Sequence, residues 1–223
     1  MKAVLLAAGV GSRLGRPFPK SLVKLPDGER ILGRQIRTLR ELGIEEIYVV
    51  VGFKMSLIME EFPNVFFRYN PFYYITNTSK SLLCALKDLD DEIIWLNGDV
   101  IADPEVLSLV LENKGNVAAV DRKKCGPEEV KYTADKDGFI QAISKTVHPA
   151  HGEAVGINKI SREDLPMFVS CLQDCADEDF FEKAMEKMIE RKGRFRAQDI
   201  SEHRCIEVDF EDDLRQALDM FSG

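Results

Sequence analysis

The stretch KAVLLAAGVGSRLGRPFPK, residues 2–20, decides the fold of this chain. It opens with KAVLLA, an almost entirely apolar run typical of a buried strand, and continues into a turn that contains Gly9 and Gly11. Such glycines let the backbone approach an anion and point several N–H groups at it. Arg13 and Lys20 add fixed positive charges. The stretch therefore predicts a strand followed by a polyphosphate-binding loop, with a plain strand-to-helix turn as the simpler alternative.

Two better-known phosphate loops do not fit this stretch. A P-loop requires G-x-x-x-x-G-K-[ST], and no lysine followed by Ser or Thr stands at that spacing after the glycines. A dinucleotide-binding fingerprint requires G-x-G-x-x-G at the start of a helix. Here the third glycine of GVGSRLG comes one position late, and Pro17 and Pro19 would break a helix. We therefore expect neither a P-loop enzyme nor a dehydrogenase.

Composition restricts the possible partners and the location of the chain. The 223 residues include 30 Lys and Arg against 38 Asp and Glu, a net charge of −8 that argues against nucleic-acid binding. The longest uncharged apolar run, residues 3–10, is far too short to span a membrane, which takes about 20 residues. That run follows Lys2 as in a signal peptide, but no small-residue cleavage site follows it. We expect a cytoplasmic protein without membrane insertion.

The cysteines support the same location. There are five, an odd number without a C-x-x-C pair, which fits neither a disulfide framework nor a four-ligand zinc site. Cys171 and Cys175 are four residues apart on a plausible helix, and we expect them to be packing residues.

The hydrophobic pattern alternates between the periods of strands and helices, which predicts an α/β fold. The first half is expected to hold strands at 2–7, 44–52, 65–69 and 92–99 and helices at 31–43, 79–89 and 103–115, the last with Asp103 at its N-cap. The second half is expected to hold strands at 116–120, 128–134, 138–144, 153–161, 194–200 and 205–209 and helices at 177–193 and 210–221. We predict a single domain, 1–223, with a parallel-sheet half at 1–115 and a smaller mixed half at 116–223.

The glycine-rich stretch resembles the signature of nucleotidyltransferases that join a nucleoside triphosphate to a phosphorylated sugar, polyol or amino alcohol. That signature, L-A-A-G-x-G-x-R followed by P-K, stands here as Leu6, Ala7, Ala8, Gly9, Gly11 and Arg13, then Pro19 and Lys20, with Ser12 at a commonly small position. The resemblance implies a nucleotide-diphospho-sugar transferase-like fold, in which helices flank a Rossmann-like, mostly parallel sheet beside a small mixed β half for the second substrate. It also implies that the loop wraps the triphosphate, with Arg13 and Lys20 as catalytic cations.

Two later segments extend the resemblance to a metal site. WLNGDVI resembles the family's strand that ends in a magnesium-binding aspartate, here Asp99, and CIEVDFEDDLRQA resembles the late segment that supplies a second carboxylate, here Asp209. Two carboxylates are suitable ligands for a Mg²⁺ that bridges a triphosphate. The alternatives are a turn-capping role for Asp99 and a helix N-cap role for Asp209.

The segment NTSKSLLCAL resembles one in cytidylyltransferases of the phosphocholine and inositol-phosphate type, where a loop enters a helix near the base. The resemblance implies that Asn77, Ser79 and Ser81 read the base, because amides and hydroxyls can bind a pyrimidine edge without adding charge. The alternative is a helix cap at Thr78 or Ser79. Looser resemblances in the second half point to residues around the acceptor, namely Lys131, Lys145, Glu153 and Gly156.

The resulting hypothesis is a Mg²⁺-dependent cytidylyltransferase that joins CTP to a small phosphorylated or phosphonate acceptor, such as phosphocholine, and releases pyrophosphate. A sugar-1-phosphate nucleotidyltransferase that uses UTP, dTTP or GTP is the nearest alternative. From another functional class, a non-catalytic nucleotide-binding regulatory module would keep the glycine-rich loop but would not need both carboxylates.

Overall fold

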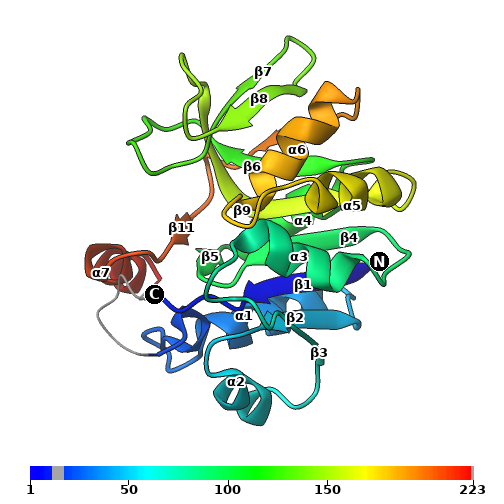
Figure 1. The fold of residues 1–223 in the computed structure, drawn as a ribbon. Coiled ribbons are helices and arrows are strands. Elements are labelled where there is room, and N and C mark those ends of the chain that lie inside the picture. The colour runs from blue at the N-terminus through cyan, green and yellow to red at the C-terminus, as the bar shows by residue number, and fades with distance from the viewer. Residues whose placement is uncertain (12–17, 222–223) are drawn as a thin grey trace.

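The computed structural model describes residues 1–11 and 18–221. Its central sheet has the strand order β10-β6-β9-β4-β1-β2-β3, with a β7–β8 hairpin beside β9 (Figure 1). Four strands of the first half are mutually parallel, β1 (Lys2–Ala7), β2 (Ile47–Val51), β3 (Phe66–Tyr69) and β4 (Ile93–Asn97). The chain is therefore an α/β protein whose main sheet is mostly parallel in its first half, as predicted.

The second half adds strands of both directions. β9 (Gly152–Ile160) runs antiparallel to β4 and to β6 (Val117–Asp121), and β10 (Arg196–Asp199) runs parallel to β6. The hairpin consists of β7 (Lys131–Ala134) and β8 (Ile140–Ser144). β5 (Val100–Ala102) and β11 (Cys205–Glu207) pair with each other outside the main sheet. The second half is thus mixed, as the sequence pattern predicted.

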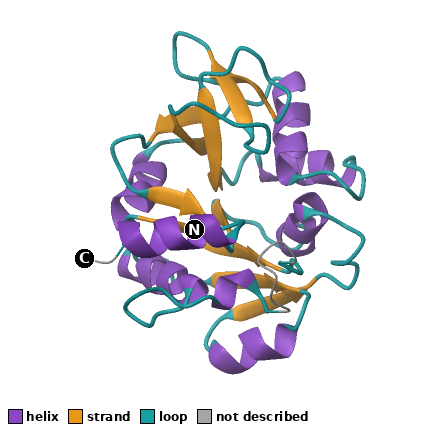
Figure 2. Cartoon of the chain, turned by 90° about the vertical axis from the view of Figure 1, so that its left-hand side faces the viewer, coloured by secondary structure: helices purple, strands orange, loops and turns teal. Residues whose placement is uncertain are grey.

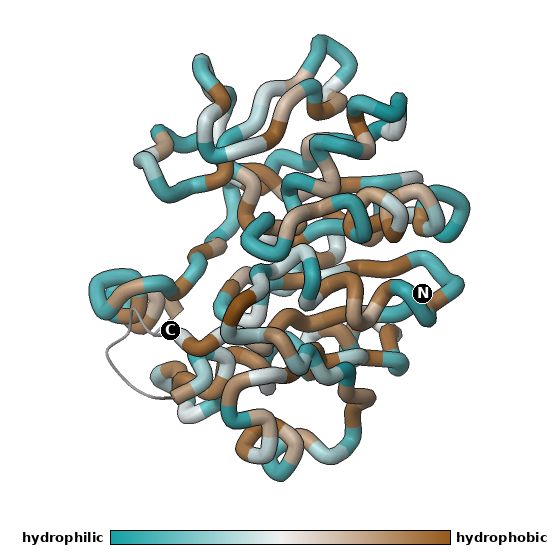
Figure 3. The backbone as a smooth tube through the Cα atoms, in the orientation of Figure 1, coloured by the Kyte–Doolittle hydropathy of each residue, from teal (hydrophilic) through white to brown (hydrophobic). Residues whose placement is uncertain are grey.

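Helices cover both faces of the sheet. Successive residues of β1 point to opposite sides, so each face of this apolar strand packs against a different set of helices. Val4 and Leu6 belong to a core with α3 (Thr78–Leu86), α5 (Leu165–Gln173) and α6 (Phe181–Glu190). Ala3 and Leu5 belong to the opposite core, with α1 (Ile31–Glu41), α2 (Met55–Glu61) and α4 (Pro104–Glu112). Figure 2 shows helices on both sides of the strands, and Figure 3 shows hydrophobic residues concentrated along the central strands.

Each predicted strand and helix has a counterpart within a few residues of its expected bounds. Cys171 and Cys175 are buried in the α3–α5–α6 core, as expected for packing residues. No range was predicted for α2, α5, β5 or the short 3-10 helix η2 (Lys20–Leu22), although Cys171 and Cys175 were expected on a helix. Three of these elements, α2, β5 and η2, contain three to seven residues each, too few for a periodic hydrophobic pattern to stand out.

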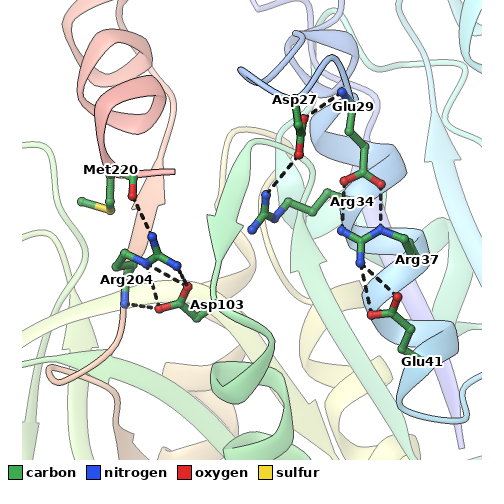
Figure 4. A network of polar contacts seen from close by, with 8 residues as sticks. All are labelled: Asp27, Glu29, Arg34, Arg37, Glu41, Asp103, Arg204 and Met220. Atoms are coloured by element: carbon green, nitrogen blue, oxygen red, sulfur yellow. Dashed lines mark hydrogen bonds and ion pairs between the residues drawn. The ribbon is translucent and has the colours of Figure 1, made fainter. Parts of the chain in front are cut away.

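Asp103 lies at its expected position, but its side chain binds a different partner from the one expected of a helix cap. It occupies the N-cap of α4, but its carboxylate makes no capping hydrogen bond. Instead it accepts from the backbone N–H of Arg204 at 2.9 Å and from the Arg204 Nε at 3.0 Å (Figure 4). A charged guanidinium is a stronger partner than a helix N–H group, and it joins α4 to the chain that enters β11.

Candidate functional site

A cavity of about 730 Å³ opens where the parallel strands β1 and β4 end. Carboxyl ends of parallel strands are the usual binding edge of α/β sheets. The first half contributes the end of β1, the glycine-rich turn and the residues that follow β4. The second half contributes the chain before β7, β9, the start of α6 and the segment around β11. Both halves of the chain therefore line one cavity.

The predicted nucleotide loop lies at this cavity. Leu6, Ala7, Gly9 and Gly11 line it, whereas Ala8 is buried behind them. Gly11 has a φ of +64°, and a Cβ there would lie 3.0 Å from the Cγ of Lys20, so a larger residue would be strained and would press on that lysine. Ser12 and Arg13 lie outside the described residues.

Lys20 is held in place by η2. The backbone N–H groups of Leu22 and Val23 donate to the carbonyls of Pro19 and Lys20 at 3.0 and 2.9 Å, and Leu22 is buried in the core. The Lys20 side chain is 11% exposed, and its ammonium lies 3.3 Å from the Asp99 carboxylate while also contacting Asp209. The predicted cation and both predicted carboxylates therefore meet at one point.

Asp99 reaches this point because Gly98 precedes it. The Gly98 N–H donates to the Leu6 carbonyl at 3.0 Å, and a Cβ at position 98 would collide with that carbonyl oxygen. Only glycine lets the turn after β4 pack this closely on β1. Asp99, the second residue of this turn, then lines the cavity and contacts Lys20, which favours the metal-binding prediction over a mere turn cap.

Asp209 is delivered from the far end of the chain. The Val208 N–H donates to the Asp99 carbonyl at 3.0 Å, continuing the β5–β11 pairing. The Arg204–Asp103 contact anchors the start of this segment, and Arg204 also donates to the Met220 carbonyl at the end of α7 (Glu211–Met220) (Figure 4). The N-cap alternative for Asp209 is wrong, because Phe210 holds that position in α7.

Lys20, Asp99 and Asp209 act on one another electrostatically. Burial alone would lower the pKa of Lys20, but Asp99 and Asp209 raise it above its ordinary value. Burial raises the pKa of the Asp99 carboxyl, the Lys20 charge opposes that shift, and Asp209 adds to it. Bringing carboxylates together therefore has an electrostatic cost that a further cation would relieve.

Glu207 is a member of this cluster that the sequence analysis missed. It lines the cavity and accepts a hydrogen bond from Asn97 Nδ2 at 3.1 Å. Enclosure by the cavity walls raises its pKa, and the carboxylates of Asp99 and Asp209 act in the same direction. The sequence did contain a signal, because Glu207 stands two residues before Asp209, and the two-residue period of an extended chain places both on one side.

The predicted base-reading residues are not all brought to the cavity. Asn77 lines it and is the N-cap of α3, accepting from the Thr78 N–H at 2.8 Å, so Asn77 holds the place expected for Thr78 or Ser79. Ser79 is fully buried, and Ser81 accepts from Asn70 within the core. Neither serine lines the cavity.

The predicted acceptor residues also divide into two groups. Glu153 and Lys145 line the cavity, where Glu153 pairs with Lys123 at 2.7 Å and Lys145 with Glu128 at 3.4 Å. Lys131 instead donates to the Lys145 carbonyl at 2.9 Å, and it does not line the cavity. Gly156 lies in β9 with a φ of +72°, where a Cβ would come 2.6 Å from Asn97 Nδ2. Lys131 and Gly156 thus shape the walls of the cavity.

Glu182, at the start of α6, is a second residue that the sequence analysis missed. Its side chain lines the cavity, is 7% exposed, and leaves Oε2 without a hydrogen-bond partner among the described residues. Burial raises the pKa of Glu182 to about 7, although a hydrogen bond from its own backbone N–H and the Lys145 charge oppose that shift. The sequence gives no signal for it, since it resembles any acidic residue of an amphipathic helix.

Glu182→Gln is expected to raise the melting temperature, and more so at about pH 8 than at about pH 4. The folded-state pKa of Glu182 lies above the ordinary value of 4.5, so the native fold loses stability as pH rises from that value through about 7. Glutamine removes the charge and keeps the shape. Thermal unfolding of both proteins across this pH range measures the difference, and a variant whose relative stability does not change with pH would contradict the expectation.

A divalent cation fits the carboxylate cluster. Among the described residues, no three His, Cys, Asp or Glu side chains form a metal site by themselves. Mg²⁺ does not need such a cage, because it is commonly held by one or two carboxylates together with water and substrate phosphates. Burial and the neighbouring carboxylates raise the pKa of Asp99 and of Glu207 although Lys20 opposes both shifts, so a further cation would stabilise their charged forms. In the described part of the chain, no helix is long and apolar enough to cross a membrane.

Comparison with known proteins agrees with this architecture. Residues 3–187 match the model of the MobA-like NTP transferase domain, and the chain therefore belongs to this family. It is 29% identical over 245 residues to CMP-5'-(3-aminopropyl)phosphonate synthase of Streptomyces rubellomurinus, a match that covers 100% of this chain and 39% of that protein. It is 37% identical over 165 residues to UTP--glucose-1-phosphate uridylyltransferase AglF of Haloferax volcanii, which covers 67% of each.

A solved structure shares the whole fold. CTP:phosphocholine cytidylyltransferase from Streptococcus pneumoniae (LicC) superposes with a TM-score of 0.79 at 20% identity, over 99% of both chains. This similarity establishes the nucleotidyltransferase fold that the sequence resemblance implied. The chain spans only about two fifths of the length of the aminopropylphosphonate synthase, so the further parts of that protein have no counterpart in this alignment.

Proposed function

We propose that the protein is a Mg²⁺-dependent cytidylyltransferase that joins CTP to a small phosphorylated or phosphonate acceptor and releases pyrophosphate. The observation that carries this proposal is the meeting of Lys20, Asp99 and Asp209 beside the glycine-rich turn, at the edge of a two-sided cavity. Membership of the NTP transferase family supports the reaction type, and the likeness to cytidylyltransferases supports the choice of CTP.

In the proposed reaction an oxygen of the acceptor phosphate or phosphonate attacks the α-phosphorus of CTP in line. A bond forms between that oxygen and the α-phosphorus, and the bond to the oxygen bridging to the β-phosphate breaks, so that pyrophosphate leaves with the electron pair. The acceptor oxygen is already ionised, and no general base is required. Lys20 opposes the repulsion between the two anions and stabilises the charge that spreads over the α-phosphate.

Asp99 and Asp209 would hold the Mg²⁺ together with oxygens of the triphosphate. When bound, the ion supplies Lewis-acid stabilisation of the phosphate charge. In the structure, Lys20 is the cation that Asp99 and Asp209 share. We infer that its ammonium turns toward the triphosphate when the nucleotide enters, because the phosphate oxygens then compete with the carboxylates for its N–H groups.

CTP is expected to be used roughly 5- to 150-fold better than UTP, measured as kcat/KM, because a mismatched buried hydrogen-bonding group costs about 1–3 kcal/mol. Cytosine donates from its exocyclic amine where uracil has a carbonyl. The Asn77 side-chain oxygen, which lies at the cavity and already accepts from Thr78, has a second lone pair for such a donor. Asn77→Ala should reduce the preference more than it reduces the melting temperature; equal use of both nucleotides by the native protein would contradict the assignment.

The alternative is a sugar-1-phosphate nucleotidyltransferase that uses UTP, dTTP or GTP, and the similarity to AglF is the observation that favours it. A non-catalytic regulatory module is disfavoured, because nucleotide binding alone does not require both carboxylates to converge on Lys20. We also place the activity in the cytoplasm, which the five cysteines support, since none of them forms a disulfide.

One experiment tests these alternatives together. The protein is incubated with Mg²⁺, each of CTP, UTP, dTTP and GTP, and a panel of phosphorylated alcohols, phosphonates and sugar 1-phosphates, and pyrophosphate release is measured. Release with CTP and a small phosphate or phosphonate supports the proposal. Release only with a sugar 1-phosphate and another nucleotide would replace it by the alternative, and no release with any pair would contradict both.

A further inference from the structure

Glu182 is a buried carboxylate of the cavity that the proposed reaction does not use and that, unlike Glu153, has no ion-pair partner among the described residues. It comes from the first turn of α6, on the side of the cavity that the second half forms, and its Oε2 has no hydrogen-bond partner among the described residues. A carboxylate in the first turn of a helix is favoured by the helix dipole. The dipole explains why a glutamate is tolerated there, but not why one oxygen is buried unpartnered at a substrate cavity.

The structure holds Glu182 in a fixed position. The Phe181 N–H donates to Thr78 Oγ1 at 3.1 Å, and the Asn77 N–H donates to the Asp177 carbonyl at 2.8 Å, so the start of α6 is tied to the start of α3. Phe181 and Met185, on the same helix, are buried in the core. The backbone from which the Glu182 side chain extends is therefore fixed, which favours preorganised binding of a ligand group.

No lysine that lines the cavity is free to neutralise Glu182. Lys20 contacts Asp99 and Asp209, while Lys123 pairs with Glu153 and Lys145 with Glu128. The positive charge of Lys145 acts on Glu182, and Glu182 in turn raises the pKa of Glu207, but within the described residues no hydrogen bond or ion pair joins Glu182 to either of them. Among the described residues no cation pairs with Glu182, so its carboxylate is open to a cation that arrives with a ligand.

Building on the proposed function, we propose that the acceptor carries a protonated amine at the end opposite its phosphate or phosphonate, and that Glu182 binds this amine. An ammonium N–H group would give the unpartnered Oε2 a charge-assisted hydrogen bond and would neutralise the buried carboxylate. The anionic end of the same molecule would face Lys20 and the metal-binding carboxylates. Glu182 thus determines which acceptors bind, while the chemistry occurs at the other end.

Calorimetric binding to matched acceptor pairs tests this inference. The pairs are 2-aminoethyl phosphate with ethyl phosphate and 3-aminopropylphosphonate with propylphosphonate, each titrated into the full chain with Mg²⁺ and α,β-methylene-CTP, which does not react. The amine-bearing member of a pair should bind roughly 10-fold or more tightly. Glu182→Gln should reduce that ratio to about 3-fold or less, whereas Glu190→Gln, an exposed carboxylate change on the same helix, should leave it unchanged.

Proton release provides a second readout. Because the free carboxyl is partly protonated near neutral pH, binding of an ammonium group should expel that proton, and titrations in buffers of different ionisation enthalpy measure it. With each amine-bearing acceptor the native protein should release more protons than Glu182→Gln does, because protons lost by the phosphate or phosphonate group itself are the same for both proteins. With ethyl phosphate and propylphosphonate the two proteins should release equally. A residue with a merely structural role would not change this signal.

Several results would overturn the inference. If the native protein binds both members of each pair with equal affinity, or binds neither member, the inference is wrong, and no variant is needed to show it. An amine preference that survives in Glu182→Gln would assign the amine to another residue. If Glu182→Gln instead weakened the CTP analogue and left the acceptor ratio intact, Glu182 would read the cytosine amine. Because binding does not require turnover, an amine preference without pyrophosphate release from any nucleotide would support the inference and contradict the proposed function.

Discussion

Lys20→Ala is expected to lower kcat by about 10²-fold or more, because one preorganised charge at a reacting phosphate contributes about 3 kcal/mol. The effect should appear in kcat rather than in the KM for the acceptor, since Lys20 acts on charge that develops at the α-phosphate. Initial rates of pyrophosphate release at saturating CTP and Mg²⁺ measure it. The melting temperature should fall as well, because Asp99 and Asp209 lose the cation that they share, and rates are therefore compared well below the unfolding transition.

Lys24→Ala is the matched control for this variant. Lys24 is an exposed lysine four residues away that does not line the cavity, so its removal changes net charge equally without touching the site. The control should retain native turnover. A Lys20→Ala protein that is folded and turns over at the native rate would remove Lys20 from the mechanism, whatever its stability.

The main sheet was predictable because its strands are buried on both faces. β1 and β4 are nearly continuous apolar runs, and glycine or polar residues follow each, so the strand ends stand out in the sequence. The position of Asp99 followed from the end of β4, and that of Lys20 from the glycine-rich stretch and its resemblance to the nucleotidyltransferase signature. Their mutual contact did not follow, because it depends on the close approach of Gly98 to β1 and on the geometry of η2.

The acceptor side could be predicted only in part. Lys145 and Glu153 lie at the cavity as expected, but Lys131, on a neighbouring strand, donates to backbone instead. Short strands with loose patterns do not reveal which side chains point inward. Glu182 could not be found at all, because its role depends on contacts between the start of α6 and the start of α3, which are 103 positions apart in the Phe181–Thr78 hydrogen bond.

Asp99→Asn and Asp209→Asn are each expected to abolish Mg²⁺-dependent turnover while the protein remains folded. Each substitution removes one of the two carboxylates that would hold the ion, and an amide oxygen is a much weaker ligand for Mg²⁺. Mn²⁺ binding in the presence of CTP, measured by electron paramagnetic resonance, should weaken in both variants. This readout reports on the metal directly and does not depend on the choice of acceptor.

Stability separates this expectation from a purely structural role for Asp99. The folded state raises the pKa of Asp99 above its ordinary value, so the charged carboxylate opposes folding at neutral pH and ceases to do so once it is protonated in both states, below about pH 4. Asp99→Asn should therefore match or exceed the native melting temperature at about pH 7 and lose that advantage at lower pH. Asp212→Asn, a substitution on α7 at a side chain that is 91% exposed, is the control and should change neither property. An Asp99→Asn protein that unfolds readily but keeps its specific activity would show that this carboxylate maintains the turn after β4 and has no part in binding the metal.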